Sequence, residues 1–303
     1  MRSCTTVVIA AVLTCGLMAW SLPAAGQTAQ QLTFSSPGRA SHALADALKA
    51  DDETKLLALF GAAGKPLVTS GDPEEDKDNR QLFVEKYAQA HRLVKEPNGS
   101  VVLYLGAENW PFPIPLVTGR NGAWYFDTAA GEQEILLRRI GRNKLATIET
   151  CHELVAAEKE HYAGAHPGEA GQYASRFATT ESGQHNALYH PTDHGQPEVG
   201  PLLAQAAGQG PGEPAPFHGY FFRMLLEQGS HAPGGAKHYI EGGKMTGGFA
   251  FLAYPAEYRS TGVMTFIVSQ DGKVYERDLG RNTEALAKAV KAFDPDPRWK
   301  PVQ

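Results

Sequence analysis

The chain has 303 residues, 42% of them hydrophobic, and its 28 basic and 33 acidic side chains give a formal charge of -5. This much apolar material excludes an intrinsically disordered chain and predicts a globular protein of one or two domains. The slight acidic excess also excludes a general nucleic-acid binder, whose affinity rests on clustered Lys and Arg that neutralise phosphates.

The N-terminus carries the pattern of a secretory signal peptide. Arg2 precedes an apolar run over residues 7–20, and small residues follow up to Gly26. A basic start, a short apolar stretch and a small-residue exit are typical of an export signal, so we expect cleavage after Gly26. The run is shorter than the roughly 20 residues that span a membrane. We therefore expect a periplasmic or extracellular protein, with no transmembrane segment once residues 1–26 are removed.

Removal of that segment changes the cysteine count. Cys4 and Cys15 leave with the signal, so Cys151 is the single cysteine of the expected mature chain and no internal disulfide can form. Cys151 lies on the apolar face of a predicted helix. We interpret it as a buried, inert thiol, and the alternatives are a nucleophile or a bridge between two copies.

Residues 27–130 are predicted to form a small α+β domain. Capping residues predict three helices, which open at Ser36-Pro37, at Asp51 or Asp52, and at Asp72-Pro73. Asn-Gly turns then separate three predicted strands, over residues 101–105, 112–117 and 123–126. This order of elements resembles the cystatin-like or nuclear-transport-factor-like cone, a fold that serves both enzymes and binding modules.

The run from Trp110 to Pro115 alternates prolines with bulky apolar residues. Because proline donates no ladder hydrogen bond, we expect this strand at a sheet edge, with Phe112, Ile114 and Leu116 pointing inward. Anchoring of the core is one interpretation of the run, and a proline-rich recognition motif is the other. Trp110 and Phe112 are accordingly candidate binding residues.

Residues 131–303 are predicted to form a second α+β domain. A long helix is expected over 132–162, with one face formed by Leu145, Ile148, Cys151, Val155 and Tyr162. A loop rich in Gly, Pro and His follows over 164–216, and ordered loops of such length often carry function.

After that loop the apolar pattern has a period of two, which predicts an antiparallel sheet packed on the long helix. Its strands are expected over residues 217–226, 236–240, 247–254, 263–269 and 273–278. Asp271-Gly272 predicts the last hairpin turn, and a closing helix is expected over 283–293.

Two resemblances follow from these segments. Five segments carry the first resemblance: the helix at 146–162, the segment at 172–174, and the strands at 218–223, 249–255 and 261–268, the last of which precedes Asp271-Gly272. Together they resemble the soluble head of type IV pilins and type II secretion pseudopilins. The resemblance covers residues 142–280 and implies a long helix, a variable loop and a sheet. Pilins assemble through a retained apolar N-terminal helix. This chain has a domain of about 100 residues there instead, so the resemblance does not imply a fibre subunit.

The second resemblance is carried by four stretches, over residues 110–117, 134–143, 232–236 and 262–268. They are similar to an uncharacterised family of exported bacterial proteins, domain of unknown function 2950. This resemblance spans nearly everything after Phe34. It implies export but assigns no activity.

Histidine is the residue type that points most directly to chemistry. His185, His190, Asp193 and His194 lie close together in the predicted loop, and neutral imidazoles with a carboxylate can ligate zinc or copper. The alternative is that these histidines are solvated or stabilise turns. No other cofactor is expected, since the sequence holds neither a phosphate-binding loop nor a glycine motif placed between a strand and a helix for a dinucleotide.

Paired glycines form a second candidate. Gly234 and Gly235 follow Pro233, and such a pair permits positive φ and close backbone approach. Either a tight turn or a bound ligand requires that freedom.

These observations favour an exported binding or assembly factor over an enzyme. Its expected partner is an envelope protein or a polysaccharide, bound at the edge near Trp110 or at the loop around Tyr189, His190 and His194. The alternatives are a metal-dependent hydrolase that uses the loop histidines, with Asp193 orienting one imidazole, and a purely structural envelope protein.

Overall fold

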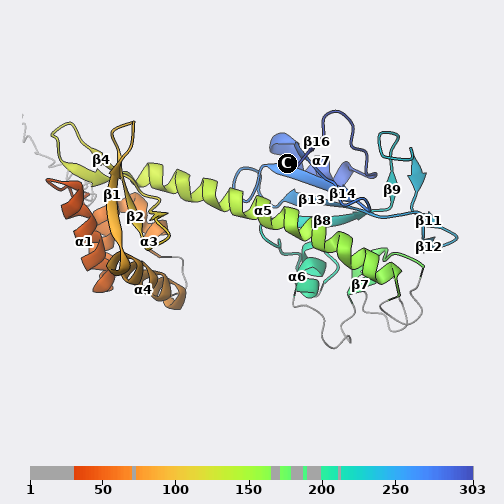
Figure 1. The fold of residues 1–303 in the computed structure, drawn as a ribbon, viewed down its shortest axis with the longest axis horizontal. Coiled ribbons are helices and arrows are strands. Elements are labelled where there is room, and N and C mark those ends of the chain that lie inside the picture. The colour runs from red at the N-terminus through yellow and green to blue at the C-terminus, as the bar shows by residue number, and fades with distance from the viewer. Residues whose placement is uncertain are drawn as a thin grey trace, which may run out of the picture. The chain divides into compact units, whose positions relative to one another are not determined.

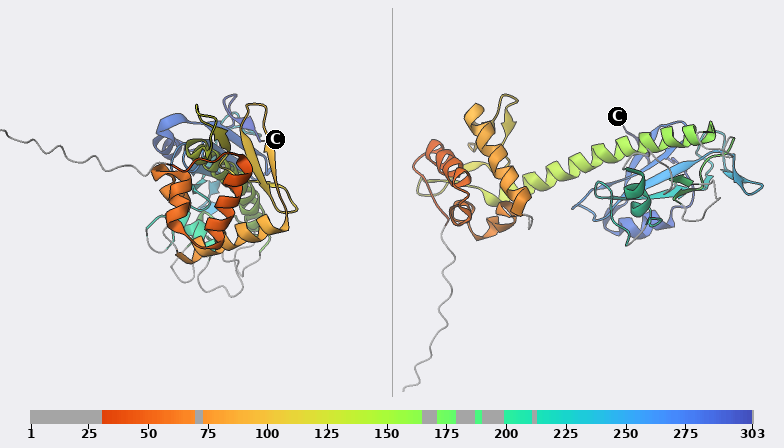
Figure 2. Two further views of the ribbon diagram at one scale, coloured as in Figure 1. Left: turned by 90° about the vertical axis from the view of Figure 1, so that its left-hand side faces the viewer. Right: turned by 90° about the horizontal axis from the view of Figure 1, so that it is seen from below.

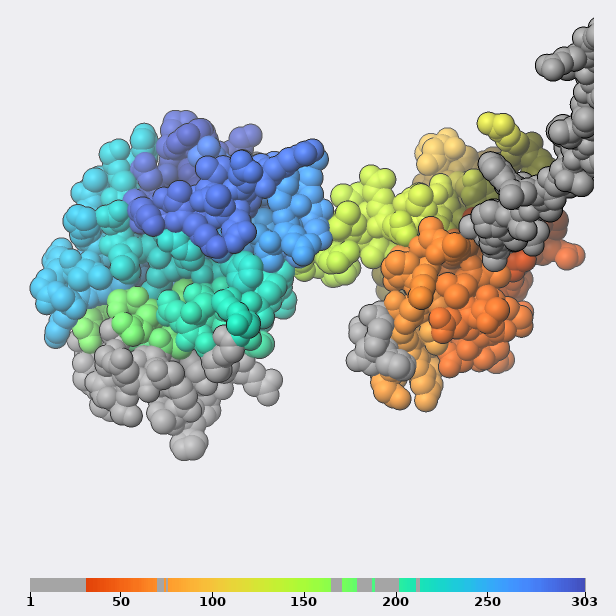
Figure 3. Space-filling view, turned by 180° about the vertical axis from the view of Figure 1, so that it is seen from behind, coloured from red at the N-terminus to blue at the C-terminus, as the bar shows by residue number. Residues whose placement is uncertain are grey.

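The computed structural model describes residues 31–69, 73–164, 171–178, 187–189, 199–210 and 213–302. The remaining residues, which include the expected signal peptide, are grey in Figure 3. The fold is α+β, as predicted, and the chain divides into two compact units between Ala129 and Ala130. We refer to them as unit 1 and unit 2.

Unit 1 opens with helices whose starts follow the capping residues (Figure 1). They are α1 (Pro37–Lys49), α2 (Glu53–Phe60), α3 (Lys65–Val68) after a 3-10 turn at Ala62–Gly64, and α4 (Pro73–Gln89). The side chains of Ser36 and Asp52 accept backbone N–H hydrogen bonds at the starts of α1 and α2, which confirms both predicted caps.

The helices cover one face of an antiparallel sheet. Its strands are β1 (His91–Lys95), β2 (Val101–Leu105), β3 (Trp110–Pro111), β4 (Leu116–Thr118) and β5 (Trp124–Phe126). The order is β1-β2-β4-β5, and β3 also pairs with β2. Along β2 the side chains alternate, so that Leu103 and Leu105 are buried in the core while Val102 and Tyr104 are half-buried on the other face.

Two predictions for this sheet need correction. The strand expected over 112–117 is interrupted, because Pro113 and Pro115 lack the N–H groups that continue a ladder, and pairing resumes only at Leu116. Ile114 and Leu116 are nevertheless buried, and Phe112 packs against the core. Strand β1 was not predicted, since its sequence contains only two apolar residues, Leu93 and Val94.

Unit 2 is built on the long helix α5, which begins two residues before the boundary (Figures 1 and 2). Its elements are α5 (Thr128–Tyr162), β6 (Arg176–Ala178), β7 (Ala187–Tyr189), α6 (Val199–Ala206), β8 (Tyr220–Leu225), β9 (Glu227–Gln228), β10 (Lys237–His238), β11 (Ile240–Glu241), β12 (Lys244–Met245), β13 (Ala250–Pro255), β14 (Met264–Ser269), β15 (Val274–Asp278), a 3-10 turn at Gly280–Asn282, α7 (Thr283–Ala289) and β16 (Lys300–Pro301).

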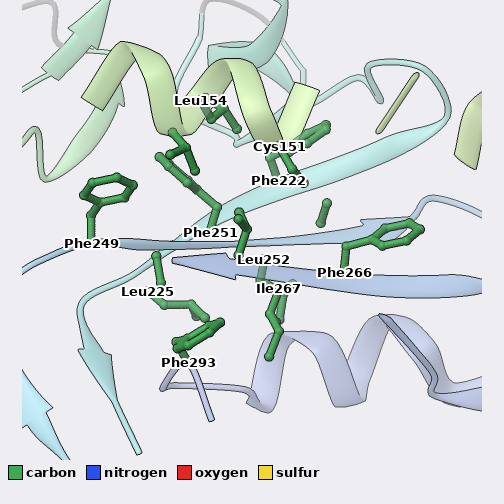
Figure 4. Packing of buried hydrophobic residues seen from close by; sticks show 14 of the residues in the cluster. Cys151, Leu154, Phe222, Leu225, Phe249, Phe251, Leu252, Phe266, Ile267 and Phe293 are labelled. Carbon is green, nitrogen blue, oxygen red and sulfur yellow. The ribbon is translucent and has the colours of Figure 1, made fainter. Parts of the chain in front are cut away.

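The main sheet of unit 2 is antiparallel, in the order β16-β15-β14-β13-β8. All residues of the central strand β13 are buried. Figure 4 shows why: Cys151 and Leu154 of α5 cover one face of the sheet, while Phe293 and the α7 helix cover the other. A sheet covered on both sides needs apolar residues at every position of its central strand, and β13 has the sequence Ala-Phe-Leu-Ala-Tyr-Pro.

Three predictions for unit 2 are wrong. Leu145 is 69% exposed, because about 100° per residue turns it well away from the face of Cys151 and Val155. The stretch expected to be a loop over 164–216 contains β6, β7 and α6. The closing helix ends at Ala289 rather than Phe293, and Phe293 is buried in the core.

Among the described residues, no helix combines the length and the apolar character that crossing a bilayer requires.

Candidate functional site

A tight turn presents Trp110 at the edge of the unit 1 sheet. The turn begins at Gly106 (φ +71°) and ends at Asn109 (φ +54°), whose N–H donates to the Gly106 carbonyl at 3.1 Å. Positive φ costs Gly and Asn less than other residues, which explains this local sequence. The Trp110 side chain that follows is 40% exposed.

Side chains from two other elements hold this turn in place. Lys86 on α4 forms an ion pair with Glu108, and Arg92 on β1 donates from Nε to Asn109 Oδ1 at 2.9 Å. Arg92 also lies over the Tyr104 ring, 4.4 Å from its centroid. The hydrogen bond from Lys86 lowers the pKa of Glu108 below its usual range. The turn is therefore tied to α4 on one side and to β1 on the other.

The indole is supported by the core on its inner side. Its ring lies edge-on to Phe112, with centroids 6.4 Å apart, and Phe112 in turn contacts Phe83 at 5.5 Å and Phe126 at 6.3 Å. In the strand register Trp110 is opposite Leu105, and Pro111 is opposite Tyr104. Phe112 thus acts as a support beneath Trp110.

This arrangement suits recognition by contact rather than by strand addition. Pro111, Pro113 and Pro115 cannot donate backbone hydrogen bonds, so this edge is a poor template for another strand. What it offers is one fixed, half-exposed indole with a carboxylate, an amide and two cationic groups in the residues that hold its turn. We define Trp110, Glu108, Asn109, Lys86 and Arg92 as the Trp110 surface.

Sequence reasoning selected Trp110 and Phe112 but missed the four polar residues of this surface. A Gly-x-x-Asn spacing between two predicted strands was a usable signal for the turn and for Asn109. Nothing in the sequence pattern indicates that Lys86 and Arg92 reach that turn, because both pairings depend on the tertiary fold.

In unit 2, Gly234 and Gly235 occupy a left-handed turn, with φ of +85° and +77°. Gln228 Nε2 donates to the Pro233 and Gly235 carbonyls at 2.8 and 2.6 Å, which fixes the turn from inside. A Cβ at either glycine would meet no atom within 4 Å. The backbone conformation therefore accounts for both glycines without a ligand.

The candidate site residues of the 164–216 stretch lie outside, or at the edge of, the residues that the structure describes. His185, His190, Asp193 and His194 lie outside the described residues, and of Tyr189 only the backbone, at the end of β7, is described. Within the described ranges, no three His, Cys, Asp or Glu side chains are grouped as metal ligands would be.

Cys151 and Glu158 of α5 are ionisable groups that are buried in unit 2. Burial raises the pKa of the Cys151 thiol to about 12, so the thiol stays protonated at neutral pH, and its predicted burial is confirmed. Glu158 is fully buried: Oε2 accepts from the Ala174 N–H at 2.9 Å, while Oε1 meets no hydrogen-bond partner among the described residues. Burial raises the pKa of Glu158 well above its ordinary value, and the Ala174 hydrogen bond opposes part of that rise.

Comparison with known families gives a match to the family described as Protein of unknown function (DUF2950), over residues 31–302. Neither the curated proteins nor the solved structures give a match. The family match takes in both units and includes Trp110, Phe112 and the Gly234-Gly235 turn. The chain belongs to this DUF2950 family.

Proposed function

We propose that the protein is an exported envelope protein that binds a polysaccharide through the Trp110 surface. The main support for this proposal is the half-exposed indole of Trp110, which follows a turn held by Lys86 and Arg92. A binding group already held in place loses little conformational freedom when a ligand arrives, so its contacts contribute more fully to affinity. Export rests on the signal-peptide pattern of residues 1–26.

The chemistry of the surface favours a sugar chain over a protein partner. Sugar rings combine an apolar C–H face with a rim of hydroxyls. An indole offers an apolar face for the first, and the Glu108 and Asn109 side chains of the adjoining turn offer acceptors and donors for the second. A stable protein interface needs a broad, well-packed core. The only other large apolar side chains of unit 1 found exposed among the described residues are Leu32 and Leu82.

Unit 2 is proposed to act as the body that carries unit 1. The long helix, the following stretch and the antiparallel sheet occur in the order that the pilin-head resemblance implies. That order supports the likeness, which we retain as part of the proposal. It concerns the scaffold alone, since a shared fold does not by itself imply a shared function.

Affinity electrophoresis of the mature chain, residues 27–303, through gels that contain envelope polysaccharides tests the proposal. We expect retardation by at least one polysaccharide and its loss in Trp110→Ala, while Trp110→Phe retains part of it because a ring remains. Leu82→Ala, which removes another exposed apolar side chain of unit 1, serves as the matched control and should migrate like the natural chain.

Retardation that is equal in Trp110→Ala and the natural chain would assign binding to another surface. No retardation by any polysaccharide would contradict the proposed ligand class and would leave an envelope protein or a purely structural role.

A further inference from the structure

Two histidines that are far apart in the sequence meet around one tyrosine in unit 1. His42 lies on α1, Tyr87 on α4 and His91 on β1. The His91 ring stacks on the Tyr87 ring at 3.8 Å between centroids, and the His42 and His91 ring centroids are 6.1 Å apart at an interplanar angle of 79°. Both imidazoles are exposed, while Tyr87 is buried. The sequence pattern gave no sign of this pairing.

The hydrogen bond of His91 fixes its tautomer. Its Nδ1 lies 2.8 Å from the Tyr87 carbonyl oxygen, and because a carbonyl can only accept, Nδ1 must carry the proton. In the neutral ring, Nε2 then holds the free lone pair.

A chain of hydrogen bonds fixes His42 in the same way. Ser41 Oγ lies 3.1 Å from the Gly38 carbonyl oxygen, which can only accept, so the Ser41 hydroxyl donates its single proton to that oxygen. All the contacts in this chain are satisfied as hydrogen bonds only when the tyrosine hydroxyl donates to Ser41 across their 3.4 Å contact. Its proton is then used, so at the 3.2 Å contact with His42 Nδ1 the hydroxyl accepts and Nδ1–H donates. The lone pair of His42 is again on Nε2.

We propose that His42 and His91 form a binding site for a divalent transition-metal ion, with Cu²⁺ preferred. Histidines that ligate metals usually donate their other ring N–H to a carbonyl or a similar acceptor, and both rings already do so. An ion bonded at about 2.0–2.1 Å to each ring separates the two nitrogens by about 4 Å or less, a span compatible with centroids 6.1 Å apart.

Imidazole ligands suit Cu²⁺, Zn²⁺ and Ni²⁺, and Cu²⁺ binds most strongly in this series. Since both rings are exposed, water or a ligand group can complete the coordination. Arg92, the cation next to His91 in sequence, pairs with Tyr104 across the strands and thus lies on the opposite face of β1, held by Asn109. This site is independent of the polysaccharide proposal.

NMR of imidazole signals during substoichiometric addition of CuCl₂ to the mature chain tests the proposal. To remove competition, the experiment uses a background in which His185, His190 and His194 are changed to Ala. Paramagnetic Cu²⁺ should broaden the His42 and His91 signals together and before any other histidine. Isothermal titration should show one tight equivalent.

His238 provides the matched comparison within the same spectra. Its side chain is 81% exposed and its Nδ1 lies 3.0 Å from Glu227, so it is an oriented single imidazole. His42→Gln or His91→Gln should reduce Cu²⁺ affinity to the level of His238. Tyr87→Phe keeps the buried ring but removes the acceptor for His42, and it should weaken binding by about tenfold or more.

Broadening of His42 and His91 no stronger than that of His238 would overturn the proposal. So would undiminished broadening of the remaining histidine in His42→Gln or His91→Gln, because an independent imidazole does not lose affinity when the other is removed.

Discussion

The sheets of the two units are covered differently. In unit 2 every residue of the central strand β13 is buried, because α5 lies on one face and α7 on the other. In unit 1 the central strand β2 alternates between buried and half-buried residues, because helices cover only one face. Unit 2 thus buries the whole of its central strand, whereas unit 1 leaves Val102 and Tyr104 of its central strand half-buried on the uncovered face.

The comparison indicates a division of roles. The fixed polar and aromatic clusters of the Trp110 surface and of His42 and His91 are both in unit 1, and each includes side chains from α4 and β1. The polar groups singled out in unit 2 serve the fold: Gln228 fixes a turn, and Glu158 holds the Ala174 backbone. We expect substitutions in the unit 2 sheet to change stability and those at the unit 1 edge to change binding.

The largest effect is expected for Phe251→Ala in β13. This ring is fully buried between α5 and the sheet, and its removal leaves a cavity that costs about 3–5 kcal/mol in the free energy of unfolding. Val102→Ala on the open face of β2 is the comparison and should cost less than about 1 kcal/mol. Native-state hydrogen exchange, which reports each unit separately, measures both. Equal losses would contradict the contrast between the two sheets.

Gly248→Ala should cost about 1–3 kcal/mol in the free energy of unfolding of unit 2. Its φ is +135°, and a Cβ there would lie 2.1 Å from Gln270 Oε1. Gly234→Ala, at positive φ but with open space around its Cβ, is the matched control and should cost about 1 kcal/mol. A smaller loss for Gly248→Ala than for Gly234→Ala in the same exchange experiment would show that packing at residue 248 is looser than described.

Glu158→Gln should change how stability depends on pH. Burial raises the pKa of this carboxyl in the folded state above its ordinary value of 4.5, so the folded protein binds the proton more tightly than the unfolded chain. Stability from this group is therefore present below about pH 4.5 and is lost as the pH rises toward the folded-state pKa.

A glutamine keeps an oxygen for the Ala174 N–H but cannot ionise. The natural chain should thus lose stability relative to Glu158→Gln as the pH rises above about 4.5, and urea unfolding over a series of pH values measures the difference. Glu153→Gln, on the exposed side of the same helix, is the control. Parallel pH profiles for the natural chain and Glu158→Gln would contradict this account of the buried carboxyl.

Asn109→Ala is expected to have a local effect on stability and a clear one on binding. It removes an exposed hydrogen bond from Arg92 and places alanine at φ +54°, which together cost about 1–2 kcal/mol locally. Polysaccharide affinity should fall several-fold because the Trp110 turn loosens. Affinity electrophoresis measures the binding, and amide hydrogen exchange at residues 106–110 measures how firmly the turn is held. Faster exchange with unchanged affinity would show that fixing the turn is irrelevant to binding.

Local chemistry predicted the parts of the fold that depend on neighbouring residues. Ser36 and Asp52 cap helices as expected, and the alternation in β2 matches a sheet that is covered on one face. The period of two expected over 247–254 was wrong for β13, whose residues are all buried because both faces of its sheet are covered. Strand β1 and the exposure of Leu145 were missed, because they depend on which neighbours the fold supplies. For the candidate site, an alternating aromatic run indicated Trp110, whereas the contacts of Lys86, Arg92 and His42 arise only when separate elements meet.

The central claim is that Trp110 is the contact point for a polysaccharide, and its indole N–H signal tests this most directly. Of the four tryptophans, Trp20 lies in the expected signal peptide, so the mature chain shows Trp110, Trp124 and Trp299. Titration with an oligosaccharide from a polysaccharide that retards the protein should shift the Trp110 indole signal in a saturable manner and leave the buried Trp299 unchanged. Saturable binding with no change at Trp110 would contradict the account.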